Sequence, residues 1–211
     1  MKKENTIDIR PVTTETVTIT LKGETPLILN KMSDPTVRLL TDQRKNKSKK
    51  VEEPNEWEEI ITSIHWKDKL PKDIVYNEET YNELLKTNQP CITAYGLKES
   101  WKQAVVRNEI DKYSTKFSSA VTMLGDGLFP VRFTEAFVDE RLMSPKKGSP
   151  VLVRLNRFTG WEADVKFSYI VGGACSLEQI LQVIALAGFG LGIGSSRNVG
   201  YGRYSIDKAT S

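Results

Sequence analysis

The hydrophobic pattern begins with the period of a strand. From Glu15 to Lys22, the apolar residues Val17, Ile19 and Leu21 alternate with threonines and a lysine. This alternation is typical of a half-buried strand, with one face on a core and the other in water. The first strand is therefore predicted here. Similar apolar or alternating runs predict further strands over 27–29, 128–133, 136–138, 151–155, 163–170 and 202–206.

Two segments have the period of a helix. Between residues 92 and 110, apolar residues including Leu97, Trp101 and Val105 recur at helical spacing. Ser176 and Gln179 form a capping-box pattern before the apolar run 180–187, which ends at a glycine. A shorter helix is predicted over 33–40. Strands interleaved with two main helices predict an α+β fold, with a ferredoxin-like core, an antiparallel sheet and insertions.

Size and composition predict one domain over 1–211. Charged residues make up 27% and apolar residues 39%, which is ordinary for a globular chain. The net charge of +3 creates no strong overall field, so any affinity for nucleic acid must come from a local patch. Cys91 and Cys175 lack the spacing of a metal or disulfide motif, so no cofactor or metal is predicted. The polar start and the lack of a long apolar run predict a cytoplasmic protein that is not membrane-bound.

Glycines concentrate near the end of the chain. Six of the fourteen glycines lie within the fifteen residues 188–202, after a predicted helix and before a predicted strand. Glycine permits positive φ and close backbone approach, so this segment either makes tight turns or clears room for a phosphate chain. Arg197 and Arg203 would supply the charge. The order of the elements argues against a dinucleotide or P-loop motif, because in those motifs the strand comes first and the helix second.

Three segments carry a resemblance to a known family. Residues 193–204, with the string Ser-Arg-Asn-Val-Gly-Tyr-Gly-Arg, resemble the C-terminal glycine-rich signature of the RAMP superfamily of CRISPR effector subunits. Residues 21–28 and 93–101 are similar to two further elements of that superfamily, whereas 41–90 match nothing in it. The layout also resembles a group of stand-alone bacteriophage proteins. The RAMP resemblance implies an RRM-like sheet, contacts to an RNA backbone through the glycine-rich loop and first long helix, and side-by-side assembly.

The candidate nucleic-acid-binding residues fall into three groups, each with an ordinary alternative as turn, solvated helix face or solvated loop. A basic loop over 41–55 is expected to be mobile. The candidates are Gly194, Ser195, Ser196, Arg197, Gly200, Tyr201, Gly202 and Arg203 in the glycine-rich segment, Lys98, Lys102 and Arg107 on the helix, and Lys45, Lys47, Lys49 and Lys50 in the basic loop. Exposed aromatic residues could stack bases, with Tyr201 and Tyr204 best placed.

The predicted function is binding of a single-stranded nucleic acid without catalysis. The resemblance favours RNA over DNA and a homo-oligomer. One alternative is a metal-dependent ribonuclease that uses Asp34, although an aspartate before proline is also common at a helix start. Another is a phage inhibitor or sponge that binds a host defence complex or a nucleotide signal. His65, the one histidine, falls in the unmatched insertion and is expected to be a loop or interface residue.

Overall fold

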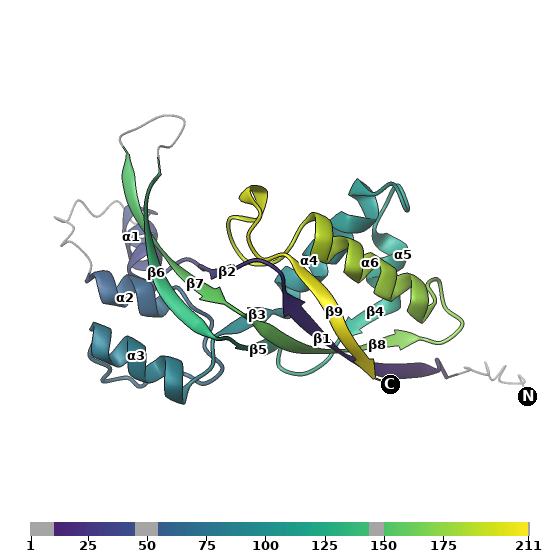
Figure 1. Cartoon of the computed structure of the whole chain (residues 1–211), viewed down its shortest axis with the longest axis horizontal. Helices are drawn as coiled ribbons and strands as arrows, with labels where there is room; N and C mark the ends of the chain where they lie inside the picture. The colour runs from purple at the N-terminus through teal and green to yellow at the C-terminus, as the bar shows by residue number, and fades with distance from the viewer. Residues whose placement is uncertain (1–10, 45–54, 144–149, 211) are drawn as a thin grey trace, which may run out of the picture.

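The computed structural model describes residues 11–44, 55–143 and 150–210 (Figure 1). The strands are β1 (Thr14–Gly23), β2 (Leu27–Leu29), β3 (Cys91–Thr93), β4 (Val121–Met123), β5 (Leu128–Arg132), β6 (Glu135–Met143), β7 (Val151–Thr159), β8 (Glu162–Ile170) and β9 (Tyr204–Thr210). The helices are α1 (Asp34–Arg44), α2 (Glu56–Thr62), α3 (Glu78–Thr87), α4 (Ala94–Arg107), α5 (Thr115–Ala120), α6 (Leu177–Gly190) and a 3-10 turn, η1 (Arg197–Val199).

The main sheet is antiparallel and has the strand order β3-β5-β8-β1-β9, with β4 also paired to β8. Val17, Ile19 and Leu21 of β1 are fully buried, which confirms the strand predicted from their alternation. The helices α4 and α6 pack on each other over this buried face (Figure 1). The opposite face carries threonines and charged residues and lies open to solvent.

The chain order of these elements explains the sheet. Leaving out the insertions, the run is β1-α4-β5-β8-α6-β9, and its four strands lie in the order β5-β8-β1-β9. Each main helix connects two strands that run parallel, and one strand of the opposite direction lies between them, so each strand is antiparallel to its neighbour. The predicted α+β fold with an antiparallel sheet and two main helices is confirmed.

Local capping sets where the two main helices begin. At α6 both bonds of the predicted capping box form, from the Gln179 N–H to Ser176 Oγ and from the Ser176 N–H to Gln179 Oε1. The helix was predicted to end at Gly188 but continues to Gly190. Gly188 instead marks a close contact with β9, since a Cβ there would lie 2.1 Å from the carbonyl oxygen of Tyr204.

A second sheet, with the order β2-β7-β6, carries a long hairpin that projects from the core (Figure 1). The strands β6 and β7 are both longer than predicted. β6 continues through the charged residues Asp139, Glu140 and Arg141, and β7 continues inward past Leu155 through Asn156 and Arg157, so polar residues interrupt the apolar signal where each prediction ended. At its base the hairpin packs on α2, where Asn156 Nδ2 donates to the Ile60 carbonyl at 3.0 Å and to Ser63 Oγ at 2.9 Å.

The insertion between β2 and β3 contains the helices α1, α2 and α3. The helix α1 runs to Arg44, four residues into the predicted basic loop, and Asn55 caps α2. Lys45, Lys47, Lys49 and Lys50 lie outside the described residues. Within the described part of the chain, no helix is long and apolar enough to span a membrane.

Candidate nucleic-acid interface

The glycine-rich segment is bound along its length to the chain around β2. The Ser195 N–H donates to the Ile28 carbonyl at 2.8 Å, and the Gly202 N–H donates to the Pro26 carbonyl at 2.9 Å. Within the segment, the Ile193 N–H donates to the Gly202 carbonyl at 2.9 Å. These backbone bonds close the segment into a fixed loop between the end of α6 and the start of β9.

Three of its glycines are required by the packing of the loop itself. Gly192, Gly194 and Gly202 have positive φ values of 71°, 77° and 70°. A Cβ at each would lie 2.6 Å, 2.4 Å and 1.9 Å from the nearest backbone oxygen of this chain. The space beside each of these glycines is therefore filled by protein backbone. Gly200, with a φ of 94°, has open space where a Cβ would be.

Three arginines line a groove between α4 and this loop, which we call the basic groove. Arg107 comes from the end of α4, Arg197 from η1, and Arg203 from the position just before β9. The cavity measures about 650 Å³, and its lining consists of Gln103, Arg107, Gly190, Leu191, Gly194, Ser195, Ser196, Arg197, Asn198 and Arg203. No carboxylate is among these lining residues, so the charges of the arginines are not balanced within the groove.

Arg203 is held by its backbone and offers its side chain to the groove. Its N–H donates to Thr25 Oγ1 at 2.9 Å, and its carbonyl accepts the Glu24 N–H at 2.8 Å. The guanidinium makes one long bond, 3.4 Å from Nη2 to the Arg197 carbonyl. Among the described residues, its buried Nη1 has no hydrogen-bond partner. A buried donor without an acceptor is costly, so the Arg203 side chain is held beside the groove at some cost in free energy.

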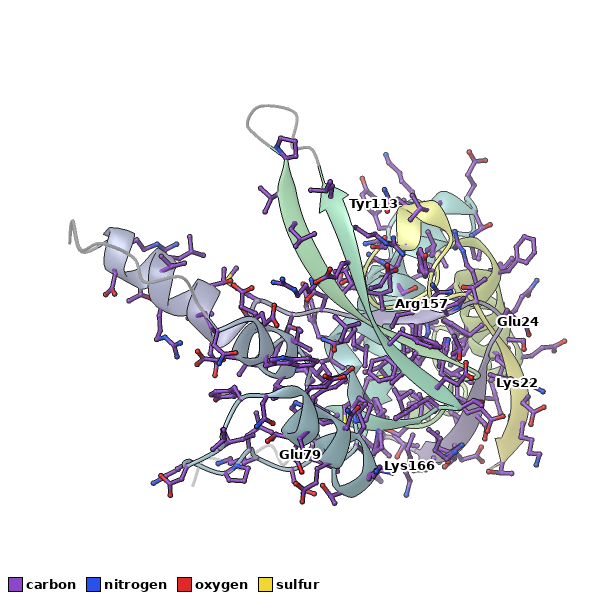
Figure 2. The ribbon with its side chains drawn as sticks, turned by 60° about the vertical axis from the view of Figure 1, so that its left-hand side comes forward. Lys22, Glu24, Glu79, Tyr113, Arg157 and Lys166 are labelled. Atoms are coloured by element: carbon purple, nitrogen blue, oxygen red, sulfur yellow. The ribbon has the colours of Figure 1, made fainter. Side chains whose placement is uncertain are left out.

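Tyr201 joins the loop to the hairpin. Arg141 of β6 donates to the Tyr201 hydroxyl and to Asp139, and its guanidinium lies 4.8 Å from the centre of the Tyr201 ring. Arg157 of β7, labelled in Figure 2 at the base of the hairpin, lies 5.9 Å from the same ring. Sequence reasoning missed these two arginines, because only the fold of the hairpin brings them to the loop. Tyr201 thus contacts two cations of the hairpin and is not among the residues that line the basic groove.

The three basic residues predicted on α4 do not act on the same surface. Lys98 Nζ donates to the Val121 carbonyl at 2.8 Å, and Lys102 pairs with Glu99 at 2.6 Å. Only Arg107 of the three lines the basic groove. The prediction that Tyr204 could stack on a base is wrong, because Tyr204 is 2% exposed and packs in the core. Trp66, Trp101 and Trp161 are buried as well.

A second cavity adjoins the groove and contains His65. We call it the His65 cleft; it measures about 560 Å³ and shares Gln103, Gly194, Ser195 and Arg197 with the basic groove. Its remaining lining is Leu29, Asn30, Lys31, Ser63, His65, Cys91, Ile92, Thr93, Tyr95, Gly96, Leu97, Glu99 and Ile193. His65 is therefore next to the glycine-rich loop, although the sequence placed it in an unmatched insertion.

Asp34 lies at the first position of α1, where its N–H donates to Thr62 Oγ1 at 3.0 Å. It lines neither the basic groove nor the His65 cleft. Over the described ranges, no group of three or more His, Cys, Asp or Glu side chains is arranged to hold a metal ion.

These features define an α+β protein with a basic groove beside a rigid glycine-rich loop. No protein-family model matches the chain, and no curated protein matches it significantly. Similar solved structures include the cryo-EM structure of the Type III-B Cmr-beta bound to cognate target RNA, with a TM-score of 0.48, 12% identity, and coverage of 93% of this chain and 60% of that chain. The crystal structure of Cmr6 from Pyrococcus furiosus gives a TM-score of 0.41 and 12% identity over 93% of this chain and 100% of that one. This chain thus spans about 60% of the length of the first.

Proposed function

We propose that this protein binds the sugar-phosphate backbone of single-stranded nucleic acid in the basic groove. The observation that carries the proposal is the convergence of Arg107, Arg197 and Arg203 on one groove whose lining has no carboxylate. Arginine is well suited to phosphate because its planar guanidinium can donate two parallel hydrogen bonds.

The open face of the main sheet is not a platform for stacked bases. Phe129, Phe167, Tyr169 and Tyr204 of its strands are all buried. The exposed side carries residues such as Thr20 and Asp164, which are hydrogen-bonded to each other at 2.8 Å. Sequence-tolerant contacts to phosphates, made by the loop and α4, fit this chain better than base recognition by the sheet.

We favour RNA over DNA because three segments, residues 21–28, 93–101 and 193–204, resemble the RAMP superfamily. The β-α-β-β-α-β order of the core supports a ferredoxin-like, RRM-like assignment for the single domain. Side-by-side assembly into a homo-oligomer and a cytoplasmic location belong to the same proposal. The ribonuclease, the phage inhibitor and a bacteriophage origin stay predictions.

Fluorescence anisotropy with a labelled single strand of about twenty nucleotides tests the proposal. We expect Arg197→Ala and Arg203→Ala each to weaken binding about tenfold, which corresponds to about 1.4 kcal/mol. The slope of log K against log salt should fall by about 0.7 for each phosphate that a variant no longer binds. Unchanged affinity and salt slope in the double variant would overturn the proposal.

A matched control is Lys166→Ala, which removes one positive charge from the open face of the sheet. Lys166 is exposed and is labelled at the lower edge of Figure 2. This variant should bind the strand as the parent does. A decrease in affinity equal to that of Arg197→Ala would show that overall charge, and not the groove, determines affinity.

A further inference from the structure

The His65 cleft differs from the basic groove in shape and chemistry. Its volume of about 560 Å³ is within the range of small-molecule sites. Its inner wall is apolar, formed by Leu29, Ile92, Leu97 and Ile193, all of which are less than one-tenth exposed. An apolar wall of this size suits a flat ring system better than it suits a bare phosphate chain.

The rim of the cleft is cationic. Lys31 follows β2, and Arg197 comes from the glycine-rich loop, so the two charges reach the cleft from different elements. The one carboxylate in the lining, Glu99, pairs with Lys102 at 2.6 Å. The helix α4 also begins at this cleft, with Thr93, Tyr95 and Gly96 in the lining, and a helix N-terminus favours an anion.

His65 and Tyr95 add two groups suited to a nucleotide. Tyr95, on the first turn of α4, is 78% exposed. Its ring is thus available to stack on a base. The carbonyl of His65 accepts the Cys91 N–H at 2.7 Å, which fixes the backbone of His65 beside β3. An imidazole on this rim can donate a hydrogen bond to a phosphate oxygen.

We propose that the His65 cleft is a site for a single nucleoside phosphate, with the base between Tyr95 and the apolar wall and the phosphate beside Lys31, His65 and Arg197. Such a site goes beyond backbone binding and does not depend on it. A free nucleotide and the phosphorylated end of a strand present the same chemistry to the cleft. The two sources are distinguished by experiment.

The single histidine makes the test direct, because its imidazole proton resonances report on this cleft alone. In the free protein, burial and the nearby Lys31 lower the pKa of His65. The other titratable groups of the lining are Cys91, Tyr95, Glu99 and Arg197. Burial raises the pKa of Cys91 to about 11, so the thiol stays neutral across the titration. A bound phosphate dianion should reverse the effect of Lys31.

The experiment follows the pH titration of the His65 resonances by NMR, without ligand and with uridine monophosphate, uridine or inorganic phosphate at millimolar concentration. We expect uridine monophosphate to raise the His65 pKa by about one unit. Uridine should leave the pKa unchanged, and inorganic phosphate should require a higher concentration than uridine monophosphate. No shift with uridine monophosphate, or equal potency of inorganic phosphate, would overturn the proposal.

Variants separate this site from the basic groove. Lys31→Ala should weaken uridine monophosphate about tenfold while an unphosphorylated strand binds as before, and Arg107→Ala, which lines only the groove, should do the reverse. Tyr95→Ala should weaken the binding of uridine monophosphate but not that of inorganic phosphate. Tyr95→Phe keeps the ring and should restore the binding of uridine monophosphate. Lys86→Ala, an exposed charge on α3, is the control. Equal nucleotide affinity in Lys31→Ala and Lys86→Ala would overturn the assignment of Lys31.

Strands identify the source of the nucleotide. An oligonucleotide with a terminal phosphate that raises the His65 pKa, when its dephosphorylated form does not, supports the strand end as the occupant. A shift with free uridine monophosphate but with neither strand supports a free nucleotide. A shift of the same size with the dephosphorylated strand would overturn the proposal, because the backbone would then explain it.

Discussion

The indole of Trp101 donates its Nε1 hydrogen to the hydroxyl of Tyr204 at 3.0 Å. Both side chains are buried, Trp101 completely and Tyr204 to 2% exposure. Trp101 belongs to α4 and Tyr204 begins β9, so this bond connects the helix that forms one wall of the groove to the strand that leaves the glycine-rich loop. Ser100 Oγ of α4 also donates to the Gly192 carbonyl at 2.7 Å, so two bonds hold α4 to the segment that carries Arg203.

Tyr204→Phe is expected to lower the free energy of unfolding by about 1–3 kcal/mol. The ring would still fill its space, but the buried indole N–H would lose its acceptor. Chemical denaturation monitored by Trp fluorescence measures the change. An unfolding free energy equal to that of the parent would show that the indole finds another acceptor.

Gly202→Ala and Gly200→Ala separate a packing role from a conformational one. Both positions have positive φ, so both variants carry a strain of about 1–2 kcal/mol. Only at residue 202 would the new Cβ meet a backbone atom, the Ile193 carbonyl oxygen at 1.9 Å. Gly202→Ala should therefore destabilise the protein several kcal/mol more than Gly200→Ala, as measured by chemical denaturation. Equal destabilisation in the two variants would contradict the close packing of the loop on itself.

Ser196→Gly is expected to stabilise the protein slightly. Ser196 has a φ of 57°, a left-handed conformation that costs a non-glycine residue about 1 kcal/mol. Its side chain is not a helix-capping hydrogen-bond acceptor for η1. Thermal melting of the variant measures the gain, and a lower melting temperature would mean that the Ser196 hydroxyl has a structural role. Because Ser196 lines the groove, strand binding should be measured in the same preparation.

Local signals in the sequence predicted the elements that carry the core. The alternation of Val17, Ile19 and Leu21 and the capping box of Ser176 and Gln179 each depend on residues close together in the chain, and each is present as predicted. The helices α2 and α3 were missed because they are short. The helix α3 buries only Tyr81 and Leu84, too few apolar residues to show a helical period.

The sites depended on contacts that no local pattern contains. His65 reaches the cleft because its carbonyl binds the Cys91 N–H, twenty-six positions later in the chain. Tyr204 turns inward because Gly188 leaves room for its backbone, so an aromatic residue beside glycines proved to be core. The arginines predicted for the loop, Arg197 and Arg203, do line a groove, since an arginine side chain is rarely buried completely.

The stability of the protein should depend on the protonation of His65. Burial, with a further contribution from Lys31, lowers its pKa from 6.5, so the unfolded chain binds a proton at a pH where the folded chain does not. The contribution of His65 to stability is therefore complete above pH 6.5 and is lost as the pH falls below that value. The melting temperature of His65→Gln should decrease less from pH 7.5 to pH 5.5 than that of the parent. Because carboxylates titrate equally in both proteins, the difference between the two curves belongs to the imidazole. Parallel curves would contradict a lowered pKa in the cleft.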